Sequence, residues 1–193
     1  GWFAVETTIV LHFLGAESLG LWSMSRMVLE AANKIPQAIS SIYFPRVTET
    51  YGRTGSPRDC FYLCRKPLQL GAPAMLVMAA VCSLVLSLLV PLFIPRYTNA
   101  VSTMCIMLLS LPLLVLEIPY ALHVAMGNVT QQYIATYASL IFFIILSLIF
   151  LKLGLGLNAV VISSLFGRFM RLAFTYYFIF NGYNQRAAFN GIH

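Results

Sequence analysis

The stretch Ile118–Leu151 decides the fold, and it reads IPYALHVAMGNVTQQYIATYASLIFFIILSLIFL. None of its 34 residues is Lys, Arg, Asp or Glu. A membrane-spanning helix needs about 20 apolar residues, so this run holds one span, a turn and the end of another. Two more charge-free runs precede it, Pro67–Pro95 and Tyr97–Leu116. Three such runs in one chain indicate a protein that crosses a bilayer several times.

The overall composition agrees with this interpretation. Of the 193 residues, 60% are hydrophobic and only 9% are charged, whereas about 25% are charged in ordinary soluble domains. The ten-residue alternating segments of a transmembrane β-barrel are absent. We therefore expect an all-α fold, a polytopic transmembrane helix bundle, with residues 1–193 forming a single transmembrane domain.

Breaker residues divide the chain into six hydrophobic segments, beginning with a short one that ends at the Gly15-Ala16-Glu17 turn. That first segment is too short to span, and residue 1 is Gly rather than an initiator Met. We expect a six-helix lobe whose first helix is truncated, within a longer protein. The expected segments are 1–14, 18–44, 67–94, 99–126, 130–151 and 158–181.

Many of the basic residues lie in one polar connection, residues 46–66, which we expect to form a loop. It contains Arg46, Arg53, Arg58, Arg65 and Lys66, and Arg186 lies in the C-terminal tail; the alternate connections contain only Arg96 and Lys152. By the positive-inside rule, the basic loop and the C-terminus are cytoplasmic. The net charge of +6 therefore indicates orientation, and we expect no nucleic-acid partner. The four cysteines have no metal-ligand spacing, and we expect no metal site.

The second segment carries polar side chains where lipid-facing residues would be apolar. Ionisable groups inside a span usually face a protein interior or a water-filled cavity. One interpretation is a substrate cavity; the other is a structural ladder in which the central carboxylate pairs with cations one turn away. The residues share one helix face: Trp22, Arg26, Glu30, Lys34, Gln37 and Ser41.

Two later spans add candidates. Glu117 lies between Pro112 and Pro119, which tend to break a helix, so it is a candidate H⁺ or Na⁺ acceptor or else a buried partner for a cation. Arg168 and Arg171 lie one turn apart and suit a phosphate, or they extend to the lipid headgroups. Glu6 either contacts the cavity or marks the start of its helix, and we favour the second.

Several sequence stretches resemble a known family. Glu6–Arg26 (ETTIVLHFLGAESLGLWSMSR) and Ile35–Arg46 (IPQAISSIYFPR) resemble the seventh and eighth helices of polysaccharide and O-antigen flippases. These flippases belong to the multidrug/oligosaccharidyl-lipid/polysaccharide exporter superfamily. Further matches are PLFIPRYT at 91–98 and GLGLNAVVIS at 154–163. The family commonly has Asp at position 6 and Tyr at position 22, and it has a second six-helix lobe.

The resemblance implies a transporter rather than an enzyme. It implies export of a polyprenyl-diphosphate-linked oligosaccharide across the bacterial cytoplasmic (inner) membrane by alternating access, for cell-surface polysaccharide biosynthesis. The chain would be the C-terminal lobe, with membrane lipid and an N-terminal six-helix lobe as partners, and with no cofactor beyond coupling to H⁺ or Na⁺. On charge alone, Arg26, Lys34, Arg168 and Arg171 would face the diphosphate.

Three alternatives stay open. A drug or organic-cation antiporter of the same superfamily would have an acidic cavity rather than a basic stripe. A membrane polysaccharide polymerase or glycosyltransferase would need a large extramembrane loop with clustered Arg, His or Asp. A membrane subunit without transport activity is the third.

Overall fold

The computed structural model describes residues 2–118, 125–126 and 129–190, with side chains to residue 179. Every regular element in these residues is helical, which confirms the expected all-α class and polytopic helical bundle. Pro119, Tyr120, His123, Gly127 and Asn128 lie outside the described residues, as does the side chain of Arg186. The elements are α1 (Trp2–Ala32), α2 (Lys34–Thr54), α3 (Pro57–Phe93), the 3₁₀ helix η1 (Pro95–Ala100), α4 (Val101–Leu108), α5 (Leu111–Leu116), α7 (Val129–Lys152) and α8 (Gly156–Asn190).

Four helical stretches in the described part of the chain are long and apolar enough to cross a membrane. They are Pro57–Phe93, Pro95–Leu116, Val129–Lys152 and Gly156–Ile179. Neither α1 nor α2 is among these four stretches. The count of six spans and the truncated first helix therefore stay predictions.

Helix α1 is sharply bent at Gly15, where the sequence predicted a turn. Gly15 has φ 81° and ψ 179°, a conformation that is essentially restricted to glycine. In a straight helix, residues 6 and 26 would lie about 30 Å apart along the axis. Their side chains instead form an ion pair at 3.4 Å, so the chain doubles back at Gly15.

The expected basic loop at 46–66 is helical instead. α2 continues past Pro45 to Thr54, and α3 begins at Pro57, so only Gly55 and Ser56 separate them. Gly55 has φ 63° and closes α2 with a hydrogen bond to Tyr51. The prediction relied on Pro45 as a helix end, but the missing N–H of a proline was tolerated here. The expected segment 18–44 is also divided, at Asn33.

The expected fourth span at 99–126 is broken into short pieces. η1 leads into α4, the helix is interrupted at Leu109 and Ser110, and α5 ends at Leu116. Pro112 lies in the first turn of α5, where a proline needs no N–H partner. The break before Pro112 agrees with the expected effect of proline on this span.

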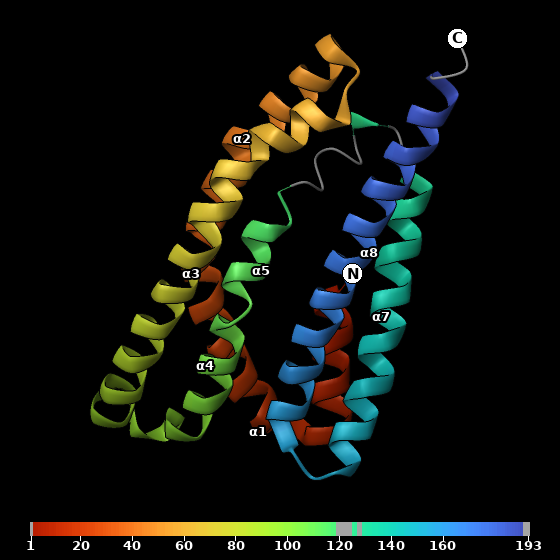
Figure 1. Cartoon of the computed structure of the whole chain (residues 1–193). Coiled ribbons are helices and arrows are strands. Elements are labelled where there is room, and N and C mark those ends of the chain that lie inside the picture. The colour runs from red at the N-terminus through yellow and green to blue at the C-terminus, as the bar shows by residue number, and fades with distance from the viewer. Residues whose placement is uncertain (1, 119–124, 127–128, 191–193) are drawn as a thin grey trace.

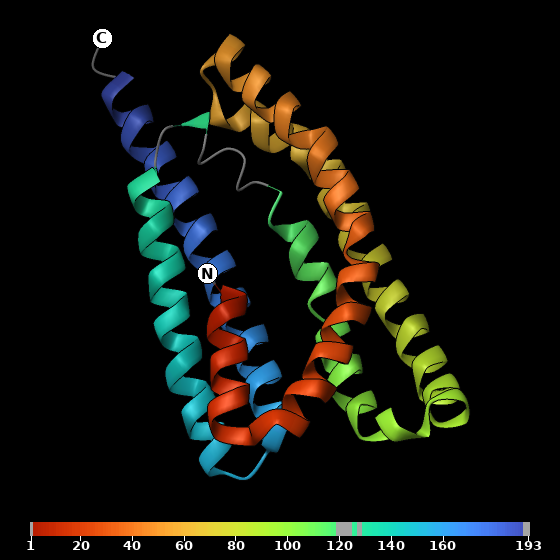
Figure 2. The same cartoon turned by 180° about the vertical axis from the view of Figure 1, so that it is seen from behind.

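Figures 1 and 2 show how the helices are arranged. α2 and α3 form one arm, α7 and α8 form the other, and α4 and α5 lie between them. The α2–α3 hairpin and the C-terminal end of α8 lie at one end of the bundle. The bend of α1, η1 and the α7–α8 turn lie at the opposite end (Figure 1). This arrangement agrees with the alternation used to predict which connections share a membrane side.

The outer face of α3 shows where the membrane boundary lies. Exposed side chains are polar up to Gln69 and, apart from Ser87, apolar from Leu70, which is 73% exposed, to Phe93, which is 72% exposed. These 24 residues span about 35 Å at 1.5 Å per residue, close to the hydrocarbon thickness of about 30 Å. We infer that the boundary nearer the α2–α3 hairpin falls between Gln69 and Leu70.

Candidate functional site

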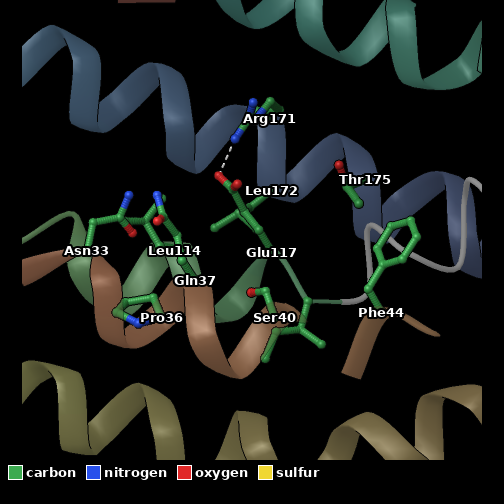
Figure 3. Close-up of a pocket in the computed structure, with 11 residues that line it drawn as sticks. Asn33, Pro36, Gln37, Ser40, Phe44, Leu114, Glu117, Arg171, Leu172 and Thr175 are labelled. Carbon is green, nitrogen blue, oxygen red and sulfur yellow. Dashed lines mark hydrogen bonds and ion pairs between the residues drawn. The ribbon is translucent and has the colours of Figure 1, made fainter. Parts of the chain in front are cut away.

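A pocket with a volume of about 410 Å³ lies between α2, α5 and α8 (Figure 3). Its walls are apolar, but amide and hydroxyl groups from α2 and α8 and one acid–base pair face into it. Such a mixture is typical of small-molecule sites. The lining residues are Asn33, Pro36, Gln37, Ser40, Phe44, Leu114, Glu117, Ile118, Arg171, Leu172 and Thr175.

The acid–base pair of the pocket is Glu117 with Arg171. Arg171 donates from Nη2 to Glu117 Oε1, and about a quarter of each side chain is exposed. Glu117 follows the last residue of α5, and Arg171 lies in the middle of α8, so the pair joins two elements 54 residues apart. Of the two interpretations of Glu117, the structure shows the carboxylate paired with a cation.

The pocket lies close to the membrane boundary on the hairpin side. A Cβ built on Gly71 would lie 2.9 Å from a Val115 side-chain carbon, so Val115 lies at the depth of Gly71, just inside Leu70. α5 runs toward the hairpin end of the bundle (Figure 1), and Glu117 follows its last residue. On α8, the Tyr176 hydroxyl donates to the Leu116 carbonyl at 3.2 Å, which places the pocket side of α8 at the same depth.

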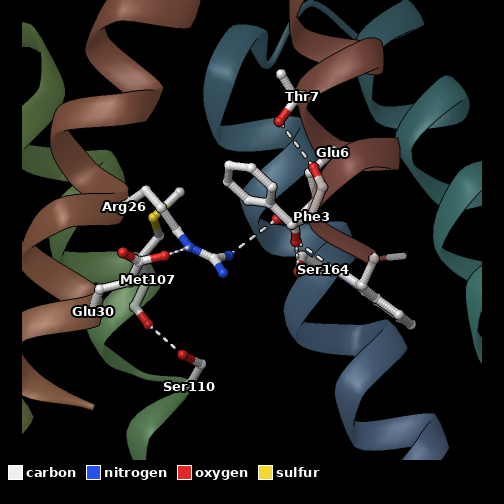
Figure 4. Close-up of polar contacts among 9 residues, drawn as sticks. Phe3, Glu6, Thr7, Arg26, Glu30, Met107, Ser110 and Ser164 are labelled. Atoms are coloured by element: carbon white, nitrogen blue, oxygen red, sulfur yellow. Dashed lines mark hydrogen bonds and ion pairs between the residues drawn. The ribbon is translucent and has the colours of Figure 1, made fainter. Parts of the chain in front are cut away.

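A second polar cluster lies deeper, around Glu6 (Figure 4). The Glu6 carboxylate is 3% exposed and accepts hydrogen bonds from Trp2 Nε1 at 2.9 Å and from Ser164 Oγ. Ser164 precedes Arg171 by seven residues on α8, about 10 Å deeper along the axis. The cluster thus ties the start of α1 to α8 inside the membrane.

Arg26 completes this cluster. Its Nη1 lies 3.4 Å from Glu6, its Nε lies 3.0 Å from Glu30, and its guanidinium carbon lies 4.8 Å from the Phe3 ring centroid. The structure therefore brings Arg26 and Glu30 together, as the structural-ladder interpretation expected. Sequence reasoning did not foresee the link to Glu6.

Arg168 lies between the two clusters. It is one turn from Ser164 and one turn from Arg171 along α8. It lines a small cavity of about 20 Å³ together with Glu6 and Arg26, and it forms no ion pair with a described carboxylate. Three arginines and three glutamates thus form one polar track from the deep cluster to the pocket.

The remaining predicted residues are separated from one another. Gln37 lines the pocket, whereas Lys34 is exposed and lines neither the pocket nor the small cavity. Trp22 is only 2% exposed, and its ring packs 5.2 Å from that of Phe3. The indole of Trp22 is therefore part of the packed core around Arg26.

Sequence reasoning favoured the other role for Glu6, as the start of its helix, and it missed Asn33, Pro36 and Ser40 of the pocket. Glu6 is the only acid in the first segment before the Gly15 bend, and Ser164 is the first residue of the polar stripe of α8. Each is a polar group on an otherwise apolar segment, and this was the signal from which a contact between them could have been predicted. Asn33 and Ser40 flank Gln37 by one turn each, and the stripe from Arg26 to Ser41 passes beside them. A slightly wider helix face would have included both.

The fold and the two clusters define the class of protein: an all-α, polytopic membrane protein with a polar pocket between its helices. No protein-family model, curated protein or solved structure matches the chain.

Proposed function

We propose that this chain is one helical lobe of an exporter that moves a polyprenyl-diphosphate-linked oligosaccharide across the bacterial cytoplasmic membrane. The pocket between α2, α5 and α8 carries the proposal, because it combines a guanidinium, amides, hydroxyls and apolar walls at the membrane boundary. A lipid-linked diphosphate has its charged group at this depth, between the sugar and the bilayer. The resemblance of Glu6–Arg26 and Ile35–Arg46 to flippase helices supports the same function.

The lining suits each part of such a head group. The planar fork of Arg171 matches phosphate oxygens. The amides of Asn33 and Gln37 and the hydroxyl of Ser40 can donate to and accept from sugar hydroxyls. Leu114 and Leu172 offer apolar contacts toward the bilayer.

The Glu117–Arg171 pair suggests how binding is coupled to an ion. A phosphate that binds Arg171 competes with Glu117 for the same guanidinium. A displaced carboxylate at membrane depth is costly unless it takes up a proton or a cation. Substrate binding and uptake of H⁺ or Na⁺ at Glu117 would therefore be linked, and a second six-helix lobe would provide the alternating access.

The proposed orientation places the α2–α3 hairpin and the C-terminus in the cytoplasm. Five of the basic residues lie between positions 46 and 66, and these lie at the hairpin end of the bundle. The pocket is then close to the cytoplasmic boundary.

A drug or organic-cation antiporter is the second candidate. Phe44 and Glu117 line the same pocket, and an aromatic ring with a carboxylate suits an organic cation. The Arg171 partner of Glu117 disfavours this candidate, because it already neutralises the carboxylate.

The experiment is a translocation assay with the natural protein that contains these residues, reconstituted in vesicles. A fluorescent polyprenyl-diphosphate oligosaccharide is added, and a membrane-impermeant quencher reports how much reaches the inner leaflet. We expect translocation well above that of empty vesicles, a loss of about tenfold or more in Arg171→Ala, and little change in Lys152→Ala at the opposite end. Transport of an organic cation without lipid translocation would favour the antiporter. If the protein transports neither the lipid nor an organic cation, the proposal is overturned.

A further inference from the structure

The outer surface of α3 carries a second hollow, away from the pocket. It has a volume of about 390 Å³ and is lined by side chains of α3. Tyr62, Arg65, Lys66 and Gln69, the outer basic patch, are spaced by three, one and three residues and share one helix face. All four are exposed, Tyr62 at 74%. On the opposite face, Cys60 and Cys64 are buried, so the patch points away from the core.

The cations of the outer basic patch have no acidic partner among the described residues. Arg26 and Arg171 both form ion pairs, but no described carboxylate lies within ion-pair distance of Arg65 or Lys66. The nearest acid on the same helix is Asp59, six residues before Arg65. The patch is therefore an unneutralised site for an anion.

The position of the patch determines which kind of anion it can meet. An apolar surface begins directly after Gln69, at Leu70, and continues to Phe93 with the exposed Ser87 as an interruption. Leu70, Val77 and Leu84 follow at seven-residue spacing and are each at least 63% exposed. They continue nearly the same face of the helix with about 20° of drift per heptad. An anion bound here has an apolar track directly below it.

We propose that the outer basic patch is a binding site for an anionic phospholipid of the phosphatidylglycerol type. The phosphodiester contacts Arg65 and Lys66, and the head-group glycerol hydroxyls hydrogen-bond to the Tyr62 hydroxyl. The Gln69 amide, one turn deeper, donates to an ester carbonyl. The acyl chains lie along Leu70, Val77 and Leu84. This site is on the lipid-facing surface of α3, and its existence does not depend on the proposed transport function.

A structural phospholipid fits the patch better than the transported lipid does. The pocket between α2, α5 and α8 is walled by helices, whereas the patch is open to the bilayer along its whole length. Two exposed apolar side chains lie next to each other below the patch, Leu76 and Val77, so each of two acyl chains has an apolar side chain to contact. The polyprenyl lipid has the same phosphate chemistry, so an experiment has to separate the two.

The test uses native mass spectrometry of the natural protein in mixed micelles containing phosphatidylglycerol, phosphatidylcholine or polyprenyl phosphate. The wild type should retain phosphatidylglycerol in preference to phosphatidylcholine. The double variant R65Q/K66Q should lose about thirtyfold in phosphatidylglycerol affinity, since each surface cation contributes about a factor of five. R65K/K66R should restore most of it, because both charges remain.

The matched control is R96Q/K152Q, which removes two exposed cations from the opposite end of the bundle. It should retain the wild-type affinity. An equal loss of phosphatidylglycerol affinity in the control would show a general charge effect and would overturn the site. An unchanged affinity in R65Q/K66Q would also overturn it. A stronger preference of the patch for polyprenyl phosphate than for phosphatidylglycerol would also overturn it. The unfolding midpoint of R65Q/K66Q in phosphatidylcholine should equal that of the wild type, and a lower midpoint would show that the residues act on folding instead.

Discussion

Glu6 and Arg26 form an ion pair across the bend of one helix, at 3.4 Å and twenty residues apart. Their contact exists because Gly15 folds α1 back on itself. The same carboxylate accepts a hydrogen bond from Ser164 of α8, so one buried acid holds three parts of the chain together. This relationship predicts which residues stabilise the lobe.

Glu6→Gln should lower the free energy of unfolding by about 2 kcal/mol. Breaking a buried pair costs about 3–5 kcal/mol, but Arg26 keeps Glu30 as a partner and is 22% exposed. Glu30→Gln is the control and should cost under about 1 kcal/mol, since Glu30 is 58% exposed. Denaturant titration in detergent measures both. Equal losses in the two variants would contradict the central place given to Glu6.

Gly15→Ala should destabilise the fold by about 2 kcal/mol, because φ 81° and ψ 179° are strained for any residue with a Cβ. No atom lies within 4 Å of the added carbon, so the effect is confined to the backbone. Gly20→Ala in the helical part of α1 has the same open surroundings and should stabilise the protein by up to about 1 kcal/mol. Shifts of the unfolding temperature in opposite directions for the two variants would support the bend. A higher unfolding temperature in Gly15→Ala would refute it.

Gly167→Ala tests the contact of α8 with α1 and α7. A Cβ there would lie 2.7 Å from the Trp2 ring and 3.0 Å from Phe143. The Trp2 ring is held by hydrogen bonds to Glu6 and Ser164, so it cannot shift freely. We expect a loss of about 1–3 kcal/mol, read from the detergent unfolding curve. Gly52→Ala, which has open space around it, should show no such loss.

The orientation is tested by cysteine labelling on intact cells. The native Cys60 and Cys64 are at most 1% exposed, so their silence would say nothing about sidedness. Arg53→Cys near the hairpin tip and Asn99→Cys in η1 are at exposed positions. In a background without the native cysteines, a membrane-impermeant reagent should label position 99 from outside and position 53 only after permeabilisation. The reverse pattern would invert the proposed orientation.

Periodicity and charge patterning sufficed for the class of fold and the Gly15 turn. They failed where tertiary context outweighs local signals. Pro45 was interpreted as a helix end, but α2 continues to Thr54. Val47 of α2 is 0% exposed in the core that also contains residues of α3, and this packing stabilises the part of α2 that follows Pro45. A proline inside a helix is costly in isolation, and sequence alone cannot show what offsets the cost.

The candidate site was predicted in part for a similar reason. Gln37, Glu117 and Arg171 were recognised as polar residues at membrane depth, and all three line the pocket. Which acid pairs with which cation depends on how the helices pack. Arg171 could have met Glu6 or Glu30, and only the fold shows that it meets Glu117. Lys34 had the same sequence signal as Arg26, but Lys34 is exposed whereas Arg26 is half-buried.

The central claim is that the pocket between α2, α5 and α8 holds the head group of a lipid-linked oligosaccharide. Photo-crosslinking tests it most directly, with a photoreactive amino acid placed at Gln37 inside the pocket or at Ile42 on another face of α2, 53% exposed. With radiolabelled polyprenyl-diphosphate oligosaccharide, the account predicts a crosslink at position 37 that excess unlabelled lipid removes, and little at position 42. Equal crosslinking at both positions, or none at 37 while the protein translocates the lipid, would contradict it.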